Sequence, residues 1–153
     1  MNRRLAVLIS GAALALAVAC DPPESEEEEQ PQPERVPAEL VEEAGDGPPE
    51  IDDGGIDSIP DDPELVEKGE HLYLVEGCAA CHLMDKEHTG PALRNITEER
   101  SASWLAKVIM HPGQMREKDP LAQHIAEQYP APMPETNVDA ETALAILAYM
   151  AAQ

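Results

Sequence analysis

The sequence predicts an all-α fold of about four to five short helices in residues 63–153, preceded by a disordered acidic tail. No segment shows the sustained alternation of apolar and polar residues that marks a half-buried strand. Asp-Pro pairs at 62–63 and 119–120 are typical helix starts, because Asp caps free amides and proline fits the first turn. The final segment carries apolar side chains at helical spacing, at positions 143, 144, 146, 147 and 150.

The first 19 residues are typical of a secretion signal. A basic start, MNRR, precedes the apolar run LAVLISGAALALAVA, which is too short to be a good membrane span. The run ends at Cys20 after small residues, and this resembles a bacterial lipoprotein signal, in which the cysteine becomes the lipidated first residue. We therefore predict a signal peptide over residues 1–19 and lipidation of Cys20. The alternative is an ordinary cleavage site that lies beside a cysteine.

Residues 20–62 are predicted to be a disordered linker. Residues 21–62 hold 17 acidic residues and one basic residue, Arg35, with many prolines and no aromatic residue. Such a segment buries too little apolar surface to offset its ordering entropy, and a short helix in PAELVEEA would be marginal alone. It would serve as a flexible tether, or only as a solubilising tail. The whole chain has a net charge of −21, which excludes nucleic acid and favours basic or neutral partners.

Four helices can be placed in the remaining residues. The first runs from Pro63 to Gly77, and the second spans SASWLAKVIMHP and ends near His111, before Pro112. The third begins at Asp119-Pro120 and stops before Pro130. Asp139 begins the last helix. We expect these helices to form one domain over residues 63–153.

The stretch CAACH at 78–82 is the strongest chemical signal. A redox-active dithiol would fit the two cysteines but needs no adjacent histidine, and a zinc site would need a fourth ligand that the spacing does not supply. Covalent haem attachment uses all three residues: Cys78 and Cys81 bind the porphyrin, and His82 binds the iron. Haem attachment of this kind occurs outside the cytoplasm, in agreement with the signal peptide. A zinc or dithiol site remains the alternative.

The composition of the domain agrees with a buried porphyrin. About 90 residues form a small core when unassisted, and the chain has no Phe and one Trp. A covalently held haem would supply the missing apolar centre. With Cys20 lipidated and Cys78 and Cys81 bonded to haem, no cysteine is left for a disulfide.

Residues 63–153 resemble a class I cytochrome c domain, a small monohaem fold. CAACH matches its haem motif, and TGPAL at 89–93 matches the Gly-Pro-x-Leu that follows. The resemblance implies that the Pro91 carbonyl accepts the ring N–H of His82. It also implies that the first and last helices cross, through Gly69, Tyr73, Ile146 and Tyr149.

The resemblance assigns the sixth iron ligand to a Met-Pro loop before the last helix, and Met133 matches it. The three prolines of YPAPMPE keep this loop extended. The other candidates are Met110, Met115, His111 and His124. Met84 lies too near His82 in the sequence, and Met150 is expected to fill the last helix's packing.

Together these features predict a one-electron carrier, not an enzyme, with one covalent haem c and the iron ligands His82 and Met133. It would be lipid-anchored on the periplasmic side of a bacterial membrane, with the inner membrane slightly favoured by Asp21. Expected partners are redox proteins of the respiratory chain or other periplasmic oxidoreductases with a basic docking face, because this chain lacks the ring of lysines common in the family. The alternatives are a haem sensor or peroxidase-like enzyme with a labile Met ligand, and the cytochrome subunit of a membrane oxidoreductase.

Overall fold

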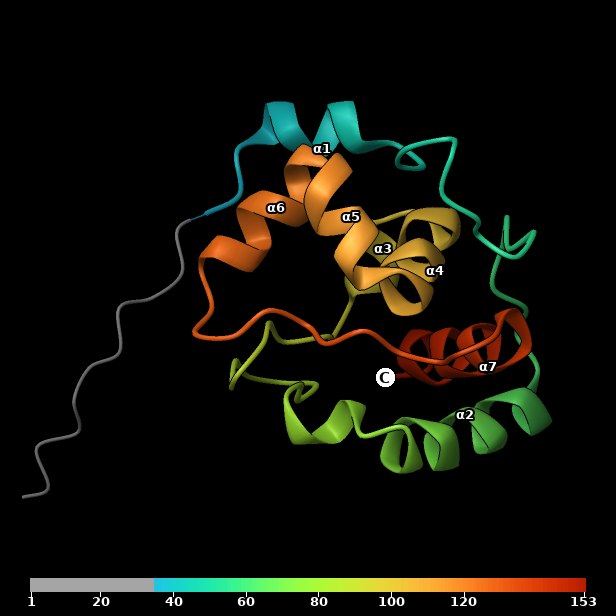
Figure 1. The fold of residues 1–153 in the computed structure, drawn as a ribbon. Coiled ribbons are helices and arrows are strands. Elements are labelled where there is room, and N and C mark those ends of the chain that lie inside the picture. Colours follow the sequence, from blue (N-terminus) through green and yellow to red (C-terminus); the bar gives the residue numbers. More distant parts are fainter. Residues whose placement is uncertain (1–34) are drawn as a thin grey trace, which may run out of the picture. The chain divides into compact units, whose positions relative to one another are not determined.

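The computed structural model describes residues 35–153 (Figure 1). Contacts divide the chain into residues 1–31 and 32–153, and the described residues belong to the second unit. The predicted signal peptide, Cys20 and the first part of the linker lie outside the described residues. Within the described part there are seven α-helices, one 3-10 turn and no strand: α1 (Ala38–Ala44), α2 (Pro63–Val75), η1 (Cys78–Ala80), α3 (Ile96–Glu99), α4 (Ala102–Met110), α5 (Pro112–Lys118), α6 (Pro120–Glu127) and α7 (Ala140–Ala151). None of these helices is long and apolar enough to span a bilayer.

The predicted all-α class is confirmed, and local capping explains where the main helices begin. The Asp62 carboxylate accepts the amide of Glu64 at 2.9 Å, and Asp119 and Asp139 accept the amides of Ala122 and Thr142 at 2.8 Å. Each capping side chain satisfies an amide that the first helical turn leaves free. Helix α5 was not predicted, because Pro112, which ends α4, also starts the next helix.

Helices α2 and α7 cross at close range (Figure 1). A Cβ atom at Gly69 would lie 1.9 Å from the carbonyl oxygen of Ala145, so only glycine allows this approach. The rings of Tyr73 and Tyr149 pack with centroids 5.3 Å apart, and Ile146 is fully buried beside them. The crossing expected from the resemblance is therefore present. It places the end of α2, and hence Cys78, beside the core.

The prediction of a disordered linker reaching residue 62 is wrong for the described residues 36–59, which we call the strap. The strap contains α1, and its Ile51 and Ile56 side chains are only 3% and 5% exposed. Figure 1 shows it running from α1, beside α6, to the start of α2. Its apolar residues are too few to form a core of their own, but they bury their surface against a core that α4–α7 already provide. The ordered part of the chain therefore begins well before residue 63.

Candidate haem-binding site

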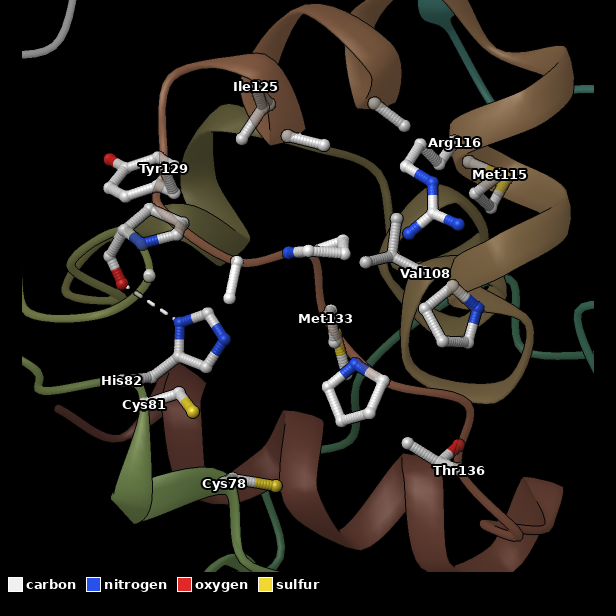
Figure 2. A pocket seen from close by; sticks show the side chains of 18 of the residues that line it. Cys78, Cys81, His82, Val108, Met115, Arg116, Ile125, Tyr129, Met133 and Thr136 are labelled. Atoms are coloured by element: carbon white, nitrogen blue, oxygen red, sulfur yellow. Dashed lines mark hydrogen bonds between the residues drawn. The ribbon is translucent and has the colours of Figure 1, made fainter.

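One cleft contains most of the predicted site residues. It encloses about 1050 Å³ of space, and this volume includes solvent at its open side. Its wall is mostly apolar and comes from helices α4, α5 and α6 and from three segments outside them, residues 76–82, 89–91 and 129–136 (Figure 2). Cys78, Cys81, His82, Pro91 and Met133 all line it.

The CAACH segment presents its three functional side chains from one short turn. Gly77 ends α2 with a φ of 82°, a left-handed conformation that glycine adopts without steric cost. The amides of Cys81 and His82 then both donate to the Cys78 carbonyl, at 3.1 and 3.0 Å. Within residues 35–153 the two cysteines form no disulfide, both are half-buried, and burial raises the pKa of the Cys78 thiol. This short segment therefore directs two thiols and one imidazole into the same apolar cleft.

The His82 ring is fixed in one orientation. Its Nδ1 lies 3.0 Å from the Pro91 carbonyl, which can only accept, so Nδ1 carries the proton and Nε2 keeps a free lone pair. A Cβ atom at Gly90 would lie 2.6 Å from the ring carbon Cε1, so a side chain there would displace the imidazole. Burial lowers the pKa of His82, and the neutral imidazole that this favours is the form that binds a metal. The contact with Pro91 agrees with the role that the family resemblance implied.

Two of the candidate thioethers line the cleft, Met133 and Met115. Figure 2 shows His82 and Met133 on different sides of the same space. Met115 is 1% exposed, and its methyl carbon lies 3.3 Å from a Cβ built on Gly47 of the strap, so this end of the side chain faces away from the cleft. The other candidates, Met84, Met110, Met150, His111 and His124, do not line it.

The polar groups around the cleft fit a haem. Trp104 lines the cleft, and its buried indole nitrogen has no hydrogen-bond partner among residues 35–153. An acceptor on a group bound in the cleft would satisfy this donor. Arg116 reaches the same cleft (Figure 2). A porphyrin has an apolar ring and carboxylate substituents, so it matches an apolar wall with an unpaired N–H donor and a guanidinium.

The zinc alternative finds no support in the geometry. Among residues 35–153, no three His, Cys, Asp or Glu side chains converge as a metal-binding cluster. A structural zinc ion would need four protein ligands in a tetrahedral arrangement. The paired thiols and the imidazole instead open towards the cleft as separate groups.

Comparison with known proteins decides the family. The family model for cytochrome c matches residues 66–153. The chain belongs to the cytochrome c family. It therefore has a covalently bound c-type haem, and it transfers electrons through the haem iron, as the family does.

Individual relatives agree with this. The chain is 33% identical over 86 residues to cytochrome c-551 of Stutzerimonas stutzeri, an alignment that covers 53% of this cytochrome and 72% of the relative. A solved cytochrome c from Rhodothermus marinus matches with a TM-score of 0.60 and 29% identity, covering 76% of this chain and 96% of that one. An engineered form of the Rhodothermus protein, solved with a carbene intermediate, matches with a TM-score of 0.57 and 28% identity, and covers 74% of this chain and 92% of that one.

Three residues that shape the site were not predicted: Gly90 and Arg116 line the cleft, and Tyr73 supports His82 from outside it. The Tyr73 hydroxyl donates to the His82 carbonyl at 2.7 Å, but its spacing on α2 indicated only helix packing. Gly90 was noticed as part of TGPAL, without its contact to the imidazole. Arg116 lies on α5, the helix that the sequence analysis did not place, so no signal located its side chain.

Proposed function

We propose that this cytochrome is a one-electron carrier in which His82 and Met133 bind the haem iron in both oxidation states. The observation that carries the proposal is the position of both side chains on one cleft, with the free nitrogen of His82 and the Met133 thioether on different sides of it (Figure 2). When bound, the haem supplies an iron that alternates between Fe(II) and Fe(III). Cys78 and Cys81 would hold its edge covalently.

The residues of the chain favour the reduced state. A thioether stabilises Fe(II) more than Fe(III), and an apolar wall disfavours the extra positive charge of the oxidised centre. The hydroxyl of Thr136 donates to the Ile109 carbonyl at 2.6 Å and ties the Met133 loop to α4. An attached loop favours the same proposed ligand, Met133, in both oxidation states. We therefore expect a positive reduction potential.

The alternative, a sensor or peroxidase-like enzyme, needs an open or labile sixth position. A peroxidase-like site would also use an acid–base side chain beside that position. His111 and His124 are the histidines that could supply one, and neither lines the cleft. The carrier is the better supported function, and the protein could act alone or as the cytochrome subunit of a membrane oxidoreductase.

The docking partner we propose is a redox protein with an apolar centre and a basic rim. Leu74 and Val75 are 61% and 58% exposed, and they lie at the end of α2, just before Cys78. The exposed carboxylates of Glu70 and Glu76 flank them in the sequence. Residues 35–153 contain 24 acidic and 8 basic residues, so a basic surface would be attracted. A lipid on Cys20 would keep this protein on the periplasmic face of a membrane near such partners.

The test of the ligand assignment is Met133→Ala. The haem should stay covalently attached, while the weak far-red band of sulfur-ligated ferric haem disappears and the reduction potential falls. Carbon monoxide should bind the reduced variant rapidly and the wild type slowly, because only the wild type must first break an iron–sulfur bond.

Met84→Ala is the matched control, because Met84 is half-buried and does not line the cleft. It should keep the far-red band and the slow reaction with carbon monoxide. A far-red band that survives Met133→Ala would move the ligand to Met115. Rapid carbon monoxide binding by the wild type would favour the sensor or peroxidase alternative.

A further inference from the structure

Two side chains of α4 and the side chain of its N-cap residue, Ser101, hold the strap by hydrogen bonds. The hydroxyl of Ser101 donates to the Gly45 carbonyl at 3.2 Å, and the ammonium of Lys107 donates to the Asp46 carbonyl at 2.7 Å. The Ser103 hydroxyl donates to the Asp53 carboxylate at 2.5 Å, and this bond and the Gly55 amide hold the pKa of Asp53 below its usual range. Lys107 is only 4% exposed. A buried ammonium needs its acceptors, so the strap is attached at defined points.

The strap also touches the wall of the haem cleft from behind. At Gly47, φ is +77°, and a Cβ atom there would lie 3.2 Å from Cδ1 of Trp104 and 3.3 Å from Cε of Met115. Trp104 and Met115 both line the cleft on their other side. Two side chains thus separate the strap backbone from the haem site. Protein interiors are close-packed, so a shift of the strap at Gly47 displaces these side chains.

We infer that the strap positions Trp104 and Met115 in the haem cleft, and that its attachment through Lys107 thereby sets the reduction potential. The inference rests on the proposed function, because a potential is measured only on the haem-bearing carrier. Lys107 does not line the cleft, so it is a positioning residue that acts through Asp46 and Gly47 on Trp104. A loosened strap lets the indole move and admits water to the cleft, and water stabilises the more highly charged Fe(III) state.

The test compares Lys107→Met with Lys118→Met in the haem-bearing protein. Both changes remove one positive charge, and both lysines contact the strap. Lys118, however, forms only a half-exposed ion pair with Glu50, at 3.7 Å. The protein has a single tryptophan, so the reduced, diamagnetic protein gives one indole N–H signal in a ¹H–¹⁵N spectrum. The readouts are that signal, its hydrogen exchange rate, the reduction potential and the melting temperature.

Lys107→Met is expected to shift the indole signal, to raise its exchange rate at least tenfold and to lower the potential, whereas Lys118→Met changes none of these. If Lys107→Met does not accumulate as folded protein, Ser103→Ala replaces it, with the same expectations. The inference is overturned if the melting temperature falls while the indole and the potential stay unchanged. Equal shifts in both lysine variants would also overturn it, because charge alone would then be the cause. A wild type without the far-red band would defeat the His82–Met133 assignment, yet the indole exchange would still report on the strap.

Discussion

At the scale of single residues, His82, the proposed iron ligand, is held by its backbone as well as by its ring. The Tyr73 hydroxyl donates to the His82 carbonyl at 2.7 Å, and Tyr73 is buried. Burial raises the pKa of Tyr73 to about 12, so the hydroxyl stays protonated and remains a donor at all physiological pH values. The bond joins helix α2 to the residue that follows the two cysteines.

Tyr73→Phe should therefore lower the free energy of unfolding by about 1–2 kcal/mol, because the His82 carbonyl loses its donor in a half-buried position. Guanidinium unfolding of the oxidised protein measures this. Tyr129→Phe is the control: the Tyr129 hydroxyl donates at 3.3 Å to the exposed Glu87, which water can solvate instead. Equal losses in the two variants would show that the Tyr73 bond is not special.

At the scale of the elements, the crossing of α2 and α7 determines where the cysteine turn lies. Asp62 and Asp139 cap the two helices, and Gly69 allows them to meet. An ion pair between Lys68 and Glu141 joins the same two helices at the surface. Because this ion pair is exposed, it contributes little to stability, so the close packing at Gly69 is the main interaction that stabilises the crossing.

Gly69→Ala should cost about 3 kcal/mol of unfolding free energy, because the added methyl group meets the backbone of Ala145, which cannot move without separating the helices. Gly113→Ala is a matched control. Its methyl group would meet the carboxylate of Glu135, the end of a flexible exposed side chain, so stability should be unchanged or rise by up to about 1 kcal/mol. Thermal unfolding of both variants gives the comparison, and a tolerant Gly69→Ala would contradict the observed crossing.

The helices were predictable because their signals are local. Asp62, Asp119 and Asp139 cap helices at the expected positions, and each signal needs only a few neighbouring residues. The strap was not predictable, because Ile51 and Ile56 become buried only against residues far along the chain. The motif at 78–82 indicated a haem site from the sequence alone. The choice among the candidate methionines required the position of the cleft, which Met110 does not line.

At the scale of the whole molecule, the main feature is a large excess of negative charge. Residues 35–153 carry 24 acidic and 8 basic residues, and residues 21–34 add seven acidic residues and no basic one. Such an excess attracts cations over a distance that salt shortens to about 8 Å at physiological ionic strength. The rate of electron transfer should therefore depend on the charge of the reaction partner.

Oxidation of the reduced protein by a cationic ruthenium ammine complex should slow severalfold as salt rises, and oxidation by anionic hexacyanoferrate should become faster. Replacing the seven acids of residues 21–34 by their amides keeps the chain length and should weaken both trends. Stopped-flow absorbance of the haem measures the rates. The same salt dependence for both oxidants would contradict the electrostatic account of docking.

The central claim, a one-electron carrier whose iron is bound by His82 and Met133, is tested most directly by a redox titration of the wild type followed by its visible spectrum. We expect a single transition with a one-electron slope, a positive midpoint potential, and a far-red sulfur band in every oxidised sample. An oxidised spectrum without that band, typical of water or a second histidine on the iron, would contradict the claim.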